Sequence, residues 1–291
     1  GLVIMSIAAL LTVFNEEKRI EYTLKTLKWC DEIWVLDKSS TDKTIEIVKK
    51  YTKNIISIES REYVPNEGII FFDYVKTDWV IMLVASDIIH PRLAFEIRKL
   101  VDDPSFFYDV ILVPYKRYIM GIDSKYSPWF TKFFPSVMKR NVVEFDSSRV
   151  HGSVYARSAR TFKLNYLPKD CCLYHLSHES PDSSLERIGR YCRAEAKVSI
   201  AERSLLVELK PVIKAIAIIF KRRTFLLGWD GISLGFLYLA YYMLRFIYIW
   251  YHKRQDFNEY DNIRKDILQA WTPFLSNIER TGKERRIDEN I

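Results

Sequence analysis

The chain has 291 residues, 48% of them hydrophobic, which is enough to bury one sizeable core plus an extension. Its net charge of +7 is not accompanied by a recognised nucleic-acid-binding motif over the first half, and no repeat or low-complexity tract occurs. These features argue against a nucleic-acid-binding protein, a solenoid and a disordered scaffold. Four cysteines, two of them adjacent at Cys171 and Cys172, form no disulfide framework, so we expect a reducing compartment.

Strand and helix patterns alternate along the first half of the chain. Apolar runs predict strands over residues 3–13, 33–37, 54–59, 79–84 and 109–114, and the first run lacks the basic segment and cleavage site of a signal peptide. Apolar residues at helical spacing predict helices over 17–30, 41–52, 91–101 and 183–205. The alternation predicts an α/β fold with a mostly parallel sheet that is flanked by helices.

The second strand ends in an acid, Asp37, before a hydroxyl-rich turn. Ser39 and Asp42 have the spacing of a capping box that opens the helix expected over 41–52. Ligands of open α/β sheets bind outside the carboxyl ends of the strands, so Asp37 lies where a ribose or a base could be hydrogen-bonded. The alternative is that these acids only terminate a strand and cap a helix.

The first strand also ends in a polar cluster, which starts at Thr12 and contains Asn15 and Glu16. Together the two strand ends resemble family 2 glycosyltransferases of the GT-A fold, closest to the bacterial lipopolysaccharide-core glucosyltransferase branch. Three blocks in order carry the resemblance: Thr12-x-Phe14-Asn15-Glu16-Glu17, Leu27-Lys28-Trp29-Cys30-Asp31-Glu32-Ile33 and Leu36-Asp37-x-x-Ser40-Thr41-Asp42-x-Thr44.

This resemblance implies a GT-A, Rossmann-like sheet and a nucleotide-sugar donor. It implies that Asn15, Glu16 and Asp37 hold the uracil and ribose of that donor. We assign the flanking polar residues Thr12, Ser39 and Asp42 to the same donor site.

The resemblance also implies a divalent metal ion. Family members end the fourth strand with Asp-x-Asp, whose carboxylates hold Mg²⁺ or Mn²⁺ against the diphosphate. Here the two acids fall at Val84 and Ser86, and only Asp87 is acidic in either register. We expect weak metal binding, by Asp87 and by His175 of a Leu-x-His-like segment, and we assign Ser86 to the donor site. A further His, His178, gives only a weak zinc-like spacing.

The base that an inverting transfer needs is not at its usual position. Related enzymes carry Val-His-Glu where this chain has Val150-His151-Gly152. Removal of the acceptor proton then falls to Asp146, Glu144 or His151. Without such a base, transfer activity is lost.

Residues 115–143 combine aromatic and basic side chains. They form either a β-rich packing layer or a platform for the acceptor sugar, because aromatic faces stack on sugars and cations contact phosphate. Lys132 in this segment, or Arg149, is expected to neutralise the leaving phosphate if no metal ion does so.

The composition changes beyond about residue 205. We expect a catalytic domain over 1–180 and a helical extension over 181–291, with one polar helix around 260–271. The uninterrupted apolar run over 231–244 is shorter than the roughly 20 residues that span a bilayer. Aromatic residues beside basic ones therefore predict an interfacial helix near 211–252 on an anionic membrane surface. The alternative is a helical pair that covers the core or forms a homo-oligomer.

The sequence thus predicts a hexosyltransferase at the inner face of the cytoplasmic membrane. It would move a sugar from a UDP-sugar to a lipid-linked or cell-surface glycan acceptor, with inversion. One opposing hypothesis is a degenerate relative that binds nucleotide-sugar or glycan without transfer. Another is a membrane-bound scaffold, which would explain the tail but not the acids at the strand ends.

Overall fold

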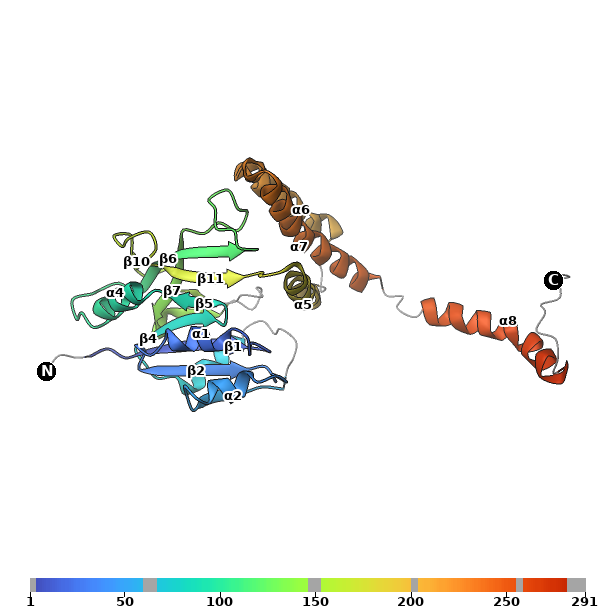
Figure 1. Ribbon diagram of the computed structural model, residues 1–291, viewed down its shortest axis with the longest axis horizontal. Coiled ribbons are helices and arrows are strands. Elements are labelled where there is room, and N and C mark those ends of the chain that lie inside the picture. The colour runs from blue at the N-terminus through green and yellow to red at the C-terminus, as the bar shows by residue number, and fades with distance from the viewer. Residues whose placement is uncertain (1–3, 60–66, 146–152, 200–203, 255–258, 282–291) are drawn as a thin grey trace. The chain divides into compact units, whose positions relative to one another are not determined.

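A nine-stranded sheet with the strand order β3-β2-β1-β4-β7-β6-β11-β5 organises the described part of the chain, and β10 pairs with β6 (Figure 1). The computed structural model describes residues 4–59, 67–145, 153–199, 204–254 and 259–281. The strands of this sheet are β1 (Ile7–Val13), β2 (Glu32–Asp37), β3 (Asn54–Ser57), β4 (Trp79–Val84), β5 (Asp87–Ile89), β6 (Val110–Ile119), β7 (Phe133–Lys139), β10 (Thr161–Lys163) and β11 (Leu173–Ser177). A separate hairpin joins β8 (Val143–Phe145) to β9 (Ser153–Tyr155).

The described helices cover both faces of the sheet and continue into the C-terminal part of the chain. They are α1 (Ile20–Lys25), α2 (Thr44–Val48), α3 (Phe71–Tyr74), α4 (Pro91–Val101), α5 (Pro181–Ser199), α6 (Leu205–Lys221), α7 (Trp229–Lys253) and α8 (Glu259–Thr281). Short 3₁₀ turns are η1 (Glu67–Ile70), η2 (Arg140–Val142) and η3 (Thr224–Leu227). The chain divides into two compact units, Gly1–Ile249 and Trp250–Ile291.

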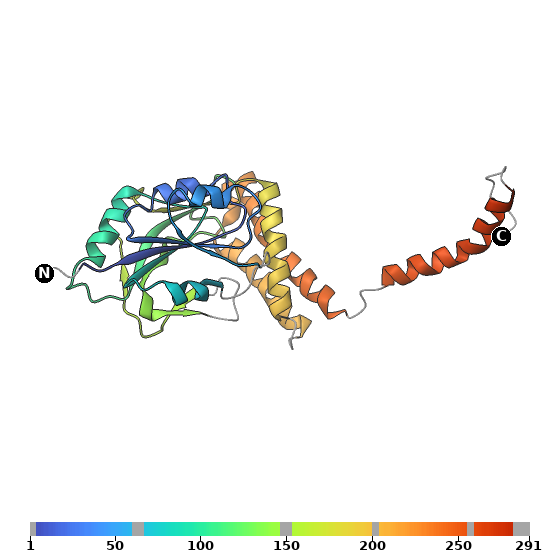
Figure 2. The same ribbon diagram turned by 90° about the horizontal axis from the view of Figure 1, so that it is seen from below.

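Alternation along β1 explains why the sheet is buried on both sides. Ala9 and Leu11 pack in a core cluster with residues of α1, α2 and α4, whereas Ala8 and Leu10 pack in a second cluster with Phe71 of α3. The two clusters correspond to the helical layers on either side of the sheet (Figure 2). A strand covered on both faces is apolar at every position, which is the pattern that predicted β1 and β4.

The sheet curls, so that β5, at the end of the strand order, lies near β4, in the middle of that order. β5 begins three residues after β4 ends, yet it pairs with β11 at the far end of the strand order. β11 in turn runs parallel to β6 and antiparallel to β5, and its His175 lies opposite Asp87. The curl therefore brings β11 beside the carboxyl end of β4.

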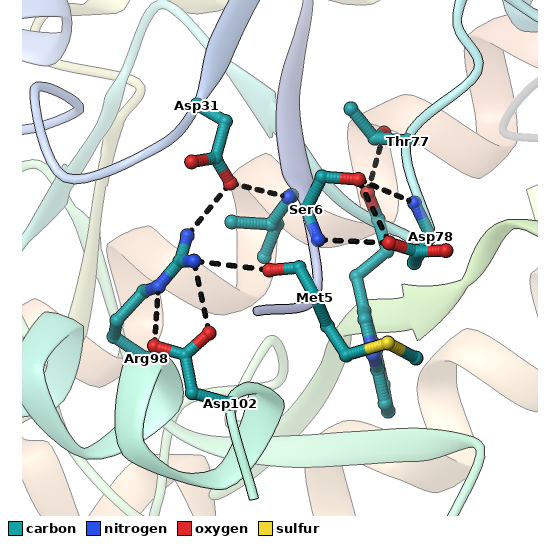
Figure 3. Close-up of polar contacts among 9 residues, drawn as sticks. Met5, Ser6, Asp31, Thr77, Asp78, Arg98 and Asp102 are labelled. Carbon is teal, nitrogen blue, oxygen red and sulfur yellow. Dashed lines mark hydrogen bonds and ion pairs between the residues drawn. The ribbon is translucent and has the colours of Figure 1, made fainter. Parts of the chain in front are cut away.

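At the other end of the strands, where β1 and β2 begin, one arginine contacts three elements. Arg98 of α4 donates hydrogen bonds to Asp102 one turn later, to Asp31 before β2 and to the Met5 carbonyl before β1 (Figure 3). Asp31 also accepts a hydrogen bond from Ile7 N at 2.8 Å. These contacts fix where β1 starts relative to α4.

The predicted fold class, a mostly parallel α/β sheet of the GT-A type with a helical C-terminal part, is confirmed. The bounds predicted for β4 and α4 match the structure. The first two helices are shorter than expected, because α1 covers Ile20–Lys25 and α2 covers Thr44–Val48. β5 was not predicted, and the helix expected over 183–205 does not include Leu205, which begins α6 after the N-cap residue Ser204; α5 is described over Pro181–Ser199.

Buried ion pairs join the helices α5, α6 and α7 at the end of the first unit. Arg245 of α7 donates to Glu195 of α5 at 2.7 Å and to Glu208 of α6 at 2.9 Å. Among the described residues α7 is the one helix that is long and apolar enough to cross a membrane by length and composition. α7 has 25 residues, so the shorter uninterrupted apolar run over 231–244 does not by itself argue against a membrane span.

Candidate active site

Three neighbouring strands end together and place the predicted donor residues side by side. Thr12 of β1 lies between Leu36 of β2 and Val84 of β4, and Val13 lies opposite Asp37. Asp37 is buried, with 5% of its surface exposed, and its Oδ1 accepts a hydrogen bond from Ser40 N at 3.0 Å. Its Oδ2 has no partner among the described residues, so one carboxylate oxygen is available for a ligand hydroxyl.

The other polar residues at these strand ends bond mainly to one another. Asn15 has a positive φ of 52°, and its Oδ1 accepts a hydrogen bond from Thr41 N at 2.8 Å. Asp42 accepts from the Thr44 N–H and hydroxyl and from Glu17 N. Burial acts to raise the pKa of Asp42, but the hydrogen bonds from Thr44 outweigh it and lower that pKa. These contacts hold the loop after β1 against the turn after β2.

The predicted capping box is wrong. The Ser39 hydroxyl donates to the Ile58 carbonyl at 2.7 Å, and the residue itself has a positive φ of 62°. No side chain caps α2, whose N-cap position is Lys43. Asp42 instead accepts a hydrogen bond from Thr44 N within the turn through Oδ1 and one from Glu17 N of the loop after β1 through Oδ2. The backbone of Glu16 donates to the Thr44 hydroxyl at 2.7 Å, so it belongs to the same loop contact.

The two predicted metal ligands bond to each other. Asp87 Oδ1 lies 2.6 Å from His175 Nδ1, and Asp87 Oδ2 accepts a hydrogen bond from Val84 N at 2.9 Å. Ser86 is 4% exposed, and its carbonyl accepts from Leu176 N. Both carboxylate oxygens of Asp87 therefore already have protein partners.

These residues do not form a metal site by themselves. No group of three or more His, Cys, Asp or Glu side chains that could hold a metal ion occurs in the described part of the chain. Hard divalent ions take six or more oxygen ligands, and of the three positions 84, 86 and 87 only Asp87 has a carboxylate. Val84, at one of the family's acidic positions, is 41% exposed and apolar.

Positive side chains surround the Asp87–His175 pair. Arg117 of β6 lies opposite His175 of β11, and its guanidinium is 5.5 Å from the ring of Tyr115, which stacks on the His175 ring. Arg117 Nε is buried and has no hydrogen-bond partner. His178 has a buried Nδ1 without a partner, and it lies against Trp129 with ring centroids 5.9 Å apart.

Helix α5 adds further arginines to this region. The guanidinium of Arg190 lies 5.6 Å from the ring of Phe14, which follows β1, so α5 reaches the carboxyl end of that strand. Burial lowers the pKa of Arg187, and the charge of Arg19 acts in the same direction, whereas Tyr191 and Glu16 act to raise it. Burial, and then the charges of Arg187 and its neighbours, lower the pKa of His178 to about 4. Several arginine side chains thus act electrostatically on His178.

The structure does not bring all of the predicted site residues together. Lys132 is exposed in the β6–β7 loop, and its Nζ lies 5.8 Å from the ring of its neighbour Phe133. Glu144 is exposed on β8. Asp146, His151 and Arg149 lie outside the described residues.

The segment over 115–143 packs in part as a layer. Tyr115 is buried and stacks on Phe134 with ring centroids 4.9 Å apart, and Trp129 packs edge-on against Tyr238 of α7 at 4.9 Å. The β6–β7 loop also contacts the end of α6, because Arg222 donates to the Phe130 carbonyl at 3.3 Å. This loop thus lies between His178 and the helices α6 and α7.

Sequence reasoning missed the arginines of α5. Arg187 and Arg190 are three residues apart, so both lie on one face of the first turns after β11. That spacing is the available signal, whereas the apolar spacing of the segment predicts only a helix. Of the residues at helical spacing that predicted this helix, Ile188 and Cys192 are buried, whereas Leu185 is exposed.

Comparisons with known proteins give one family and several relatives. The family model described as "Glycosyl transferase family 2" matches residues 9–164. An uncharacterised glycosyltransferase of Rickettsia bellii (strain RML369-C) is 25% identical over 240 residues, which cover 77% of this chain and 79% of that protein.

Two solved structures are similar in fold. S. aureus TarS 1-349 in complex with UDP-GlcNAc has a TM-score of 0.47 at 17% identity, covering 98% of this chain and 94% of that chain. The mannosyltransferase PcManGT of Pyrobaculum calidifontis in complex with GDP-Man and Mn²⁺ has a TM-score of 0.49 at 13% identity, covering 86% and 88%. A match to a longer TarS chain covers 39% of that chain.

Proposed function

Because the chain belongs to glycosyl transferase family 2, we propose that it is an inverting hexosyltransferase that uses a UDP-sugar donor. The proposal rests on the position, burial and hydrogen bonding of Asp37. It is buried at the carboxyl end of a central strand, one oxygen is fixed by Ser40 N, and the other has no partner among the described residues. A preorganised carboxylate of this kind can accept a hydrogen bond from a ribose hydroxyl or from an N–H group of the base.

In the proposed reaction an acceptor hydroxyl attacks the anomeric carbon of the donor sugar. The new carbon–oxygen bond forms as the bond to the diphosphate breaks, and the electron pair of that bond leaves on the nucleotide. A base takes the acceptor proton, a contribution typically of about 10²–10⁴ in rate. We assign this role to the set Asp146, Glu144 and His151, of which Glu144 is exposed in the structure.

Mg²⁺ or Mn²⁺ would bind weakly and only together with the donor. The carboxylate expected to bind the metal ion, Asp87, is already bonded to His175. Diphosphate oxygens would have to supply most of the other ligands.

The acceptor we propose is a lipid-linked or cell-surface glycan, in line with the motif resemblance to the lipopolysaccharide-core branch. Support comes from the apolar tip between α6 and α7, where Phe220, Phe225, Leu226 and Trp229 are exposed, Trp229 to 83%. Exposed apolar patches of this kind mark interaction surfaces. Lys221 and Arg223 adjoin the tip and are also exposed.

This tip would hold the protein at an anionic membrane on the cytoplasmic side. The Thr224 hydroxyl at the tip donates to the Tyr126 carbonyl of the β6–β7 loop at 2.8 Å. The same loop packs Trp129 on His178 in the candidate site. A membrane-bound acceptor would therefore approach the site along this loop.

Donor binding is tested by calorimetry with UDP. Asp37→Ala should weaken binding by about 0.5–1.5 kcal/mol, the value of one hydrogen bond. Asp73→Ala is the matched control, because Asp73 is an exposed acid on α3. Unchanged UDP affinity in a folded Asp37→Ala protein would contradict the donor assignment.

Catalysis is tested by a transfer assay with a panel of nucleotide-sugars, with and without excess EDTA, for the wild type and for Asp87→Ala. Turnover that requires metal and survives the loss of Asp87 would contradict the metal assignment. UDP binding without turnover for any donor and acceptor would favour the degenerate, binding-only relative.

Membrane binding is tested by flotation with anionic liposomes. Replacing Lys214, Lys221 and Arg223 by Gln should weaken binding by about 1 kcal/mol per basic residue. Arg222 is kept, because it holds the β6–β7 loop. The matched control replaces three exposed lysines of the catalytic part, Lys25, Lys49 and Lys50. A wild-type protein that does not float with the liposomes would favour the homo-oligomer interpretation of the tail.

A further inference from the structure

Two arginines at the candidate site, Arg117 and Arg187, form no ion pair among the described residues. Glu16 pairs with Arg19 at 2.5 Å, and Asp87 pairs with His175 at 2.6 Å. Within the described part of the chain, neither guanidinium group is within ion-pair distance of a carboxylate, although the charge of Glu16 acts on Arg187 from farther away.

These groups also have unmet hydrogen-bonding capacity. Arg117 Nε is shielded from solvent without a partner, and so is Nδ1 of the nearby His178. Most buried polar groups in proteins have hydrogen-bond partners, so two orphan nitrogens in one site indicate a missing ligand. A charge that is partly buried and unpaired is costly to the folded protein. An anion with several oxygen acceptors would satisfy both deficits.

We propose that Arg117 and Arg187 bind the diphosphate of the nucleotide donor, so that donor binding does not require a divalent metal ion. The inference rests on the proposed function and specifies how the donor is held. Guanidinium groups match phosphate oxygens with fixed pairs of N–H donors. In the transfer step they would also stabilise the negative charge that develops on the leaving diphosphate oxygen.

This assignment replaces the cations expected from the sequence. Lys132 is exposed, and its ammonium group lies near the ring of Phe133 rather than beside Asp87 or His175. Arg117, in contrast, is in register with His175, and Arg187 is close enough to lower the pKa of His178. Both arginines thus belong to the region where the family's metal ion would neutralise the diphosphate.

The first experiment compares UDP and uridine by calorimetry in excess EDTA. The wild type should bind UDP in EDTA, and Arg187→Gln and Arg117→Gln should each bind it about ten- to a hundredfold more weakly, as expected for a lost charge-assisted hydrogen bond. Uridine binding should be unchanged in both variants. Arg193→Gln is the matched control, because Arg193 is an exposed arginine of the same helix that bonds to Tyr248.

The second experiment separates a binding role from a structural role by the sign of a stability change. Without ligand, Arg187→Gln should melt at or above the temperature of the wild type, since it removes a like charge from the site. Inorganic pyrophosphate in EDTA should raise the melting temperature of the wild type but not that of Arg187→Gln. A variant that melts lower and binds UDP normally would overturn the proposal.

The outcomes distinguish this inference from the proposed function. If the wild type binds UDP only with Mn²⁺ and the arginine variants bind it equally well, the arginine assignment fails and the glycosyltransferase proposal stands. If the wild type binds neither UDP nor uridine under any condition, both fail. If UDP binding in EDTA depends on both arginines, the inference holds.

Discussion

Replacing Arg98 by Met removes the contacts that fix the amino-terminal edge of the sheet while it keeps much of the side-chain volume. The guanidinium bonds to Asp102 through two atoms at 2.8 and 2.9 Å, to Asp31 at 2.7 Å and to the Met5 carbonyl at 3.0 Å (Figure 3). We expect the variant to fold but to be less stable. The candidate site lies at the opposite ends of the strands, so UDP binding should not change.

The contacts set the size of the expected loss. The bond to the Met5 carbonyl has a charged donor and contributes about 1.5 kcal/mol. Asp102 lies one turn along the helix, and the Asp31 side chain is 42% exposed, so these two pairs contribute only about 0.5 kcal/mol each. The free energy of unfolding should fall by about 2.5 kcal/mol. Lys99→Met removes an exposed charge from the same helical turn and should change it by less than about 0.5 kcal/mol.

Urea unfolding followed by tryptophan fluorescence measures both variants, and pH adds a second check. Burial acts to raise the pKa of Asp31, but hydrogen bonds from Arg98 and Ile7 N outweigh it and lower that pKa. A carboxyl group with a lowered pKa stabilises the protein above its unfolded pKa of about 4, and this contribution is lost as the pH falls through the folded value. The difference between wild type and Arg98→Met should therefore shrink below about pH 4. An equal loss in Lys99→Met, or a difference that is constant from pH 7 to pH 3, would refute the reasoning.

Other variants test separate contacts. Gly231→Ala should destabilise the protein by about 1–3 kcal/mol in thermal unfolding, because a Cβ there would lie 1.9 Å from the Thr224 carbonyl oxygen. Gly235→Ala is its control, since its Cβ would meet only side-chain atoms at 3.6 Å or more, and it should be neutral or slightly stabilising. Cys172 should react slowly with a thiol reagent in the native protein at pH 8, because burial raises its pKa to about 11, and quickly after denaturation. Asp109→Asn should lower stability at pH 7 and match the wild type in strong acid, because hydrogen bonds from its cationic partners hold the pKa of Asp109 well below its ordinary value.

Local sequence predicted the elements whose limits are set locally. β4 is an apolar run that is buried on both faces, and α4 begins with Pro91 after His90, whose side chain accepts a hydrogen bond from Arg92 N. The limits of α2 could not be predicted in this way. Asp42 bonds to Glu17 N of the loop after β1 as well as to its own turn, and such a contact between residues distant in sequence is not visible in the local pattern.

The site was predictable only up to the strand ends. Asp37 could be placed because its strand, its turn and the motif resemblance agree, and the register of β1 with β2 puts it beside Val13. The surroundings of Asp87 depend on the curl of the sheet, which pairs β5 with β11. No local pattern indicates that pairing. The contribution of α5 depends on it too, because the helix follows β11 directly.

The missing acids and the additional arginines have a common electrostatic explanation. In an Asp-x-Asp site two carboxylates cancel the charge of a divalent ion, and the protein and metal together are close to neutral before the diphosphate binds. Here Val84 and Ser86 supply no charge, Asp87 is paired with His175, and Arg117 and Arg187 add two positive charges. Acids at 84 and 86 would instead add negative charge after β4, where it would repel a diphosphate that is bound without a metal ion. The apolar and hydroxyl residues at these two positions are therefore what a diphosphate site based on arginine requires, and the departure from the metal-binding pattern is compatible with a working donor site.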